Sequence, residues 1–135
     1  GSPIQHQIIK GMKKSYVSIY RINKEIDGGE IFQQRKLDIS LSINKILSQL
    51  TKIGFNISID ILIKFINAEL KFKKQKKYKK VYKRRKPSDS KFNLKEIKNI
   101  NFTKFNNFVR ALNDPYPNAY FNIGKTTYKF SLIPS

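Results

Sequence analysis

An acidic residue followed by two glycines stands between two segments rich in aromatic and β-branched residues. Asp27 precedes Gly28 and Gly29. A carboxylate at such a point can orient a histidine base or stabilise a developing positive charge. The glycines allow the backbone to approach a flat ligand closely, and Asp-Gly also suits a hairpin turn that needs a positive φ. The spacing alone favours the plain hairpin turn over a catalytic loop.

A second group of candidate residues combines positive charge with an aromatic ring. Arg84 and Arg85 lie at the end of a basic run, and a guanidinium can hold a phosphate or a carboxylate through two contacts. Tyr116 stands between two prolines, which stiffen the loop and present the ring. Such a ring offers a platform for a nucleobase. The alternative is a connector between a helix and a strand, with Tyr116 packed as an apolar lid.

The single histidine, His6, is expected on a helix surface or in the core rather than as a catalytic base. No metal site is expected, because one histidine and no cysteine cannot supply a usual zinc shell. The absence of cysteine also excludes disulfides. The sequence contains neither a glycine-rich phosphate-binding motif nor a Gly-x-Ser-x-Gly elbow.

The formal net charge is +19, from 28 Lys and Arg against 9 Asp and Glu. Such a balance predicts a polyanionic partner, although a lysine-, asparagine- and isoleucine-rich composition also follows from AT-rich coding. Lys71 to Lys86 form a basic run in which Tyr78 and Tyr82 could stack on bases. A solvated linker produces the same pattern. A non-enzymatic, basic RNA-binding module therefore remains an open alternative.

The 135 residues suffice for one small domain or for part of a larger one. Strands are expected at Tyr16–Ile22 and Ile31–Ile39, with the Asp27 turn between them. Ser40 and Ser42 are candidate N-caps of a helix of about 25 residues whose apolar stripe needs a covering element. No uninterrupted apolar run of about 18 residues exists, so no helix is expected to span a membrane.

The second half of the chain is expected to begin with an irregular basic segment. A helical segment then covers residues 93–112, a loop covers 113–118, and a hairpin at 119–123 and 126–133 turns at Gly124-Lys125. These expectations divide the chain into residues 1–70, a basic crossing segment at 71–92, and a helix with a hairpin at 93–135.

Three motifs occur in the order found in the folate-dependent formyltransferases. Ser2-Pro3-Ile4-Gln5, followed by Ile8-Ile9-Lys10-Gly11, resembles the helix after the catalytic histidine loop of that family. Ile26-Asp27-Gly28-Gly29-Glu30-Ile31 resembles its aspartate loop. The downstream signature is similar to Tyr82–Asp89 and to Arg110-Ala-Leu with Pro115-Tyr-Pro-Asn-Ala-Tyr.

The resemblance implies an α/β fold: the second half of a Rossmann-like formyltransferase domain, followed by a small C-terminal helix-hairpin unit. It implies formyl transfer from N10-formyltetrahydrofolate to a primary amine, with a histidine as base, an asparagine at the oxyanion and an aspartate that orients the histidine. Only the aspartate carries over, as Asp27, because the other two precede the Ser2 segment in the family. We therefore expect the C-terminal part of a larger cytoplasmic enzyme, inactive by itself.

The resemblance also assigns binding residues and an acceptor. Gly28 and Gly29 would bind the cofactor, and the substrate would be bound by Arg84, Arg85, Asn113, Tyr116 and Tyr120. A nucleotide-linked amino sugar is the preferred acceptor, because the residues after Ile123 are too few for the β-barrel of the tRNA enzymes. Methionyl-tRNA is the alternative acceptor. No membrane partner is expected, and a homodimer is allowed.

Overall fold

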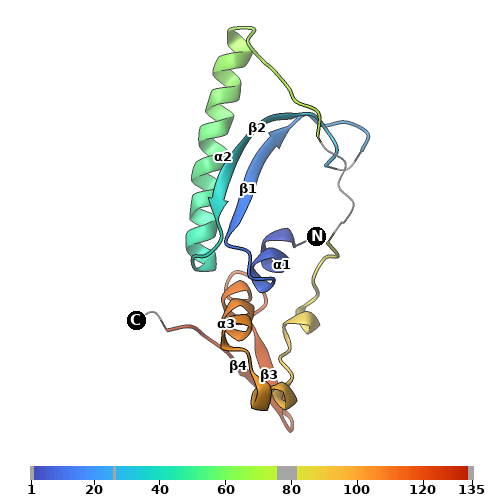
Figure 1. Cartoon of the computed structure of the whole chain (residues 1–135), viewed down its shortest axis with the longest axis vertical. Coiled ribbons are helices and arrows are strands. Elements are labelled where there is room, and N and C mark those ends of the chain that lie inside the picture. The colour runs from blue at the N-terminus through green and yellow to red at the C-terminus, as the bar shows by residue number, and fades with distance from the viewer. Residues whose placement is uncertain (1, 26, 76–81, 134–135) are drawn as a thin grey trace.

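The computed structural model describes residues 2–25, 27–75 and 82–133. It is a mixed α/β structure, as expected, in which a long helix lies along a two-stranded ribbon and a smaller helix-hairpin unit lies at one end (Figure 1). Tyr78 of the basic run lies outside the described residues, and so does the expectation that its ring stacks on bases.

The first hairpin places the Asp27 turn between β1 (Lys14–Tyr20) and β2 (Ile31–Asp38), which pair antiparallel. The observed β1 begins two residues before the predicted start at Tyr16 and ends two residues before the predicted end at Ile22. Its pairing is irregular between Ile19 and Tyr20, and Ile22 is 90% exposed. The chain has left the ribbon by that point, and an exposed isoleucine in a loop carries the same β-propensity as one in a strand.

Helix α2 (Ile43–Ile66) confirms the long helix. Ser42 is the N-cap residue, but its side chain makes no capping hydrogen bond. Ser40 instead donates its hydroxyl and its backbone N–H to the Asp38 carboxylate, at 2.6 and 2.8 Å. These bonds lower the pKa of Asp38. Both serines therefore lie at the start of the helix without capping it through their side chains.

The apolar stripe of α2 is covered along only part of its length. Ile43, Ile46 and Ile57 are buried against the ribbon, whereas Phe65 and Ile66 near the end of the helix are 69% and 79% exposed. Among the described residues, α2 is long and apolar enough to cross a membrane by length and composition, despite its interspersed polar residues. One such helix is weak evidence for a membrane span, because core helices of soluble proteins pass the same test.

The segment expected to be one helix at 93–112 is two helices. A 3₁₀ helix covers Leu94–Asn99 and α3 covers Phe102–Ala111. Asn101 causes the break, because its side-chain oxygen accepts a hydrogen bond from the Lys104 N–H at 2.9 Å and so caps a new helix. The apolar periodicity runs through both pieces and does not reveal this break.

The C-terminal hairpin consists of β3 (Tyr120–Ile123) and β4 (Thr126–Lys129), and Gly124 turns at a φ of 57°. The second strand ends four residues before the predicted Ile133. Phe130 follows it and meets Phe92, Phe105 and Phe121 in ring contacts of 4.9 to 5.8 Å. This aromatic cluster attaches the hairpin to α3.

One buried cluster joins the long helix, the ribbon and the smaller unit. Its members come from α1 (Pro3–Ile9), from β2, α2 and the link between them, and from α3 and the loop that follows it: Ile8, Leu37, Ile39, Ile43, Ile46, Val109, Ala111, Leu112 and Ala119. Arg110 adds a polar link, because its guanidinium donates hydrogen bonds to the backbone oxygens of Ile39 and Leu41. The division at residues 70 and 92 remains a prediction, since this core draws on both sides of it.

Candidate functional site

The Asp27 turn is a well-bonded surface loop. The turn contains the positive φ that its Asp-Gly-Gly sequence predicts, and it is Asp27 itself that adopts it, at 55°. The Asp27 carboxylate is exposed and accepts a hydrogen bond from the Tyr20 hydroxyl. This hydrogen bond is the main cause of a raised pKa at Tyr20. The loop therefore presents a carboxylate to solvent with one hydroxyl partner.

Gly29 is required by the chain's own backbone. A Cβ atom at this position would lie 1.5 Å from the Arg21 carbonyl oxygen, and one at Gly28 would lie 2.7 Å from the Glu25 Cβ. The close approach that the glycines permit is therefore made to the neighbouring backbone and side chain. Their role in cofactor binding remains a prediction.

Gln75 holds the Asp27 loop from the side, and sequence reasoning did not identify it. Its amide nitrogen donates to the backbone oxygens of Asp27 and Gly29, at 2.9 and 2.5 Å. Two hydrogen bonds of 2.8 Å between the backbones of Ile31 and Lys73 bring this segment alongside β2. Gln75 stands inside a basic run, and neither its spacing nor its neighbours distinguish it.

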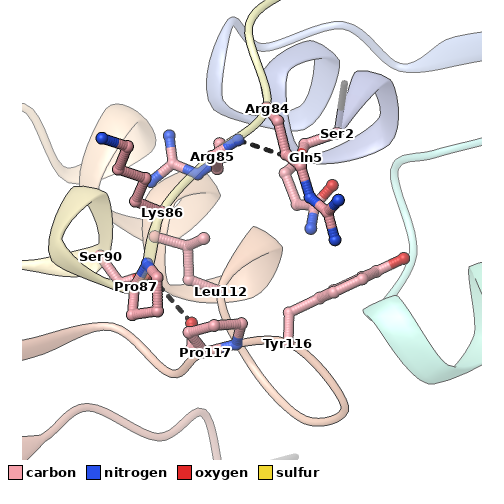
Figure 2. Close-up of a pocket in the computed structure, with 10 residues that line it drawn as sticks. All are labelled: Ser2, Gln5, Arg84, Arg85, Lys86, Pro87, Ser90, Leu112, Tyr116 and Pro117. Atoms are coloured by element: carbon pink, nitrogen blue, oxygen red, sulfur yellow. Dashed lines mark hydrogen bonds between the residues drawn. The ribbon is translucent and has the colours of Figure 1, made fainter.

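A groove brings together three of the predicted substrate-binding residues. Arg84, Arg85 and Tyr116 line it, and Figure 2 shows that Arg84 and Tyr116 approach from opposite sides. It consists of adjoining cavities of about 510 and 420 Å³ that share Ser2, Gln5, Arg84 and Tyr116. Because α1, residues 84–90 and the loop after α3 all contribute, segments distant in sequence form one concave surface.

One wall of this groove contains a buried polar atom without a partner among the described residues. Gln5 also lines the groove and is 7% exposed. The Arg85 guanidinium donates to the Asp89 carbonyl oxygen, but its Nε is buried without a partner. Burial lowers the pKa of Arg85, partly offset by the Asp89 carboxylate. Helical spacing places Gln5 on the same face as the buried Ile8, a signal that could have identified it.

The other candidate residues lie outside the groove lining. The Asn113 side-chain oxygen accepts from the Asp114 N–H at 3.0 Å, and Tyr120 begins β3, where its backbone oxygen accepts from the Phe92 N–H at 2.6 Å. His6 has a structural position on α1: its Nε2 donates to the Lys83 carbonyl oxygen at 2.9 Å, and its ring stacks on Tyr82. These contacts attach residues 82–86 to α1 and so form one wall of the groove.

The structure does not bring Asp27 next to the groove. Strand β1 leads from the end of α1 to the Asp27 loop (Figure 1). At about 3.3 Å per residue, this strand separates the two by roughly 20 Å. The chain therefore carries two distinct candidate regions: an exposed acidic loop and a cationic, partly buried groove.

No family model matches the chain, but known proteins of similar sequence and fold exist. A methionyl-tRNA formyltransferase from Lactobacillus johnsonii is 32% identical over 131 residues, covering 96% of this chain and 40% of that protein. The solved methionyl-tRNA formyltransferase from Clostridium thermocellum is 31% identical, with a TM-score of 0.80, over 98% of this chain and 56% of that one.

A likely sugar N-formyltransferase from Mycobacterium tuberculosis shares the fold, with a TM-score of 0.81 at 22% identity over 99% of this chain and 59% of that one. The chain thus spans about 40% of the length of the curated relative and 56–59% of the two solved chains. Over nearly its whole length the chain is similar to folate-dependent formyltransferases, and it matches a C-terminal portion of them.

Proposed function

We propose that this chain is part of an enzyme that transfers a formyl group from N10-formyltetrahydrofolate to a primary amine. The observation that carries this proposal is the similarity of nearly the whole chain to formyltransferases, at 31–32% identity and with a TM-score of 0.80. Formyltransferases of this family use N10-formyltetrahydrofolate. We expect Gly28 and Gly29 to lie against this cofactor.

Asp27 is the residue of this chain that we assign to the chemistry. The amine must lose a proton as it attacks the formyl carbon, and a base takes that proton. A carboxylate near the base holds it in position and stabilises the positive charge that develops on it. Tyr20 supports this role, because its hydroxyl fixes the direction of the Asp27 carboxylate. The base and the oxyanion donor would come from a longer protein, so we expect the 135-residue chain alone to be inactive.

We propose a nucleotide-linked amino sugar as the acceptor. The groove supports this choice, because its size, its guanidinium groups and the ring of Tyr116 suit a compact ligand with phosphates and a flat base. Methionyl-tRNA is a second candidate. It is favoured by the names of the relatives above 30% identity and by the net charge of +19, which suits a polyanion.

The transfer itself is tested in a chimera. The matched portion of the Clostridium thermocellum enzyme is replaced by residues 1–135, and formyl transfer from N10-formyltetrahydrofolate is measured by the appearance of formylated product. We expect the chimera to be active with at least one of the two acceptors. A folded chimera that transfers no formyl group to either acceptor would contradict the proposal.

The choice of acceptor is tested by thermal shift on the chain itself. We expect dTDP- or UDP-linked amino sugars to raise the unfolding midpoint, in a manner that persists at moderate salt. Stabilisation by methionyl-tRNA alone would reverse our preference. A shift by any RNA that falls steeply with salt would instead support a basic RNA-binding module.

A further inference from the structure

We infer that Gln75 is a positioning residue for Asp27: its side-chain amide fixes the backbone of the Asp27 loop and thereby the direction of the carboxylate. The consequence for catalysis rests on the proposed function, in which this carboxylate orients a base. The positioning itself belongs to the chain and can be measured without any reaction. The hydrogen bonds of Gln75 go to backbone oxygens of the loop, so Gln75 acts through Asp27 rather than on a substrate.

One amide nitrogen bridges two peptide units of the loop. The Gln75 Nε2 donates to the Asp27 carbonyl oxygen at 2.9 Å and to the Gly29 carbonyl oxygen at 2.5 Å. A side-chain amide carries two N–H donors, so both bonds can form at once. Within the loop, the Gly28 N–H donates to the Glu25 carbonyl oxygen at 3.3 Å, which is longer than either bond from Gln75. The loop therefore depends on a residue 48 positions later in the chain.

The sequence of the loop explains why it needs an external hold. Asp27 has a φ of 55°, in the left-handed region that costs a non-glycine residue free energy. Gly28 and Gly29 follow it, and glycines restrict the backbone very little. Without the two bonds from Gln75, the loop would relax toward commoner backbone conformations, and the carboxylate would move with it.

The segment that carries Gln75 is itself anchored to the ribbon. Figure 1 shows that the chain leaving α2 returns to the end of the ribbon from which the loop extends. Two hydrogen bonds of 2.8 Å join the backbones of Lys73 and Ile31. The Arg21 guanidinium lies over the Phe72 ring, 4.1 Å from its centroid. These contacts attach the segment to both arms of the hairpin, so Gln75 reaches the loop from a fixed base.

Tyr20 connects the held backbone to the carboxylate. Its hydroxyl donates to the Asp27 carboxylate, and this hydrogen bond is the main cause of the raised pKa of Tyr20. Its ring lies against Gly29, because a Cβ atom at that glycine would be 3.3 Å from the Tyr20 Cδ2. Since Gln75 fixes the Gly29 carbonyl group, the amide, the ring and the carboxylate form one connected arrangement. The ionisation of Tyr20 therefore reports on the position of the carboxylate.

The experiment is an absorbance titration of tyrosine ionisation on the intact chain, with the signal of Tyr20 assigned by its absence from Tyr20→Phe. Gln75→Ala should shift this late ionisation toward the ordinary tyrosine pKa of 10.0, because the carboxylate is no longer held at the hydroxyl. Gln75→Met, which keeps the side-chain length but has no donor, should give the same shift. Gln34→Ala is the matched control: the Gln34 amide donates to the Ser18 hydroxyl at 2.9 Å on the same ribbon, and its loss should leave the titration unchanged.

A double-mutant cycle in the chimera with the Clostridium thermocellum enzyme measures the consequence for catalysis. Because a displacement of 1 Å can cost a reaction about 10²-fold, we expect Gln75→Ala to lower kcat by roughly 10- to 100-fold at saturating cofactor and acceptor. In the Asp27→Asn background, the same change should lower kcat by less than about twofold, because the carboxylate through which Gln75 acts is gone. A merely structural role of Gln75 predicts the same loss in both backgrounds.

Three results would overturn the inference. The first is a Tyr20 ionisation that stays in place in Gln75→Ala. The second is one that stays in place in Gln75→Met, since packing rather than hydrogen bonding would then hold the loop. The third is an equal loss of kcat in the two Asp27 backgrounds.

Failure of the proposed function gives a different result. An inactive parent chimera refutes the formyl transfer, while a Tyr20 titration that depends on Gln75 still supports Gln75 as the residue that positions the carboxylate. An active chimera whose Tyr20 titration is unchanged in Gln75→Ala refutes the positioning alone.

Discussion

The Asp27 loop and the groove differ in how their polar groups are bonded. In the loop, a hydroxyl bonds the exposed carboxylate of Asp27, and Gln75 bonds the backbone oxygens of Asp27 and Gly29. In the groove, the Nε of Arg85 is buried and lacks a partner among the described residues. The loop matches a family motif, and its polar groups are hydrogen-bonded without a ligand. The groove has a weaker sequence signal, and it contains a polar atom that is still available for a hydrogen bond.

This difference shows that sequence motif and binding capacity need not coincide. A catalytic carboxylate needs to be held in position and to remain accessible, and the loop provides both. A binding groove needs buried polar groups that only the ligand satisfies, at a cost to the stability of the free protein. The two regions should therefore respond differently to substitution.

The largest expected effect concerns the core beneath the groove. Ile8 is fully buried on α1, so Ile8→Ala should lower the free energy of unfolding by about 2–5 kcal/mol. The matched variant Ile22→Ala, in the exposed part of the Asp27 loop, should change it by less than about 0.5 kcal/mol. Urea unfolding measures both. Equal losses would show that the loop is as firmly packed as the groove.

The next effect concerns the backbone of the loop. Gly29→Ala would place a Cβ atom 1.5 Å from the Arg21 carbonyl oxygen, so the loop must shift, and we expect a loss of about 2 kcal/mol. Gly54→Ala is the matched control, because a Cβ there meets nothing within 4 Å and the helix should gain about 1 kcal/mol. Unfolding curves of the two variants should shift in opposite directions. An unchanged Gly29→Ala would mean that the loop has no fixed conformation.

A smaller effect is expected from Gln75. Gln75→Ala removes two hydrogen bonds to the loop, worth about 1 kcal/mol each. Hydrogen exchange should accelerate at residues 27–31, while the amides of β4 stay unchanged. Accelerated exchange throughout the chain would indicate global destabilisation instead.

The smallest effect is the pH dependence of the Tyr20–Asp27 contact. The pKa of Tyr20 is raised because its hydroxyl donates to Asp27, so this contact stabilises the fold below the ordinary tyrosine pKa of 10.0. That stabilisation should be lost as the pH rises through the folded-state pKa. Absorbance titration should show a late tyrosine ionisation that is absent in Tyr20→Phe and shifted to lower pH in Asp27→Asn. Identical titrations of the wild type and Asp27→Asn would exclude the contact in solution.

Periodicity and turn chemistry predicted much of the fold. The spacing of apolar residues identified α2, and glycine with its neighbours identified the turns at Asp27 and Gly124. The break at Asn101 was not predicted, because the apolar periodicity continues on both sides of the cap. Likewise, β-propensity extended the strands past Tyr20 and Lys129, since it does not report where pairing stops.

The site was predictable only in part. Arg84, Arg85 and Tyr116 were selected for their chemistry and meet in one groove, because the core that joins α1 to α3 brings distant segments together. Asn113 and Tyr120 carry suitable chemistry, but their observed contacts are to the chain itself. Gln75 was missed, since a neutral amide gives no charge signal and its partners, the backbone oxygens of Asp27 and Gly29, are far away in sequence.

The most direct test of the central claim is the effect of Asp27→Asn on formyl transfer by the chimera with the Clostridium thermocellum enzyme. Glu25→Gln, in the same exposed loop, is the matched control for the loss of one negative charge. The proposed role predicts that Asp27→Asn lowers kcat by about 10²–10⁴-fold with little change in KM, and that Glu25→Gln leaves both near those of the parent chimera. An Asp27→Asn chimera that retains full kcat would contradict the assignment of Asp27 to the chemistry.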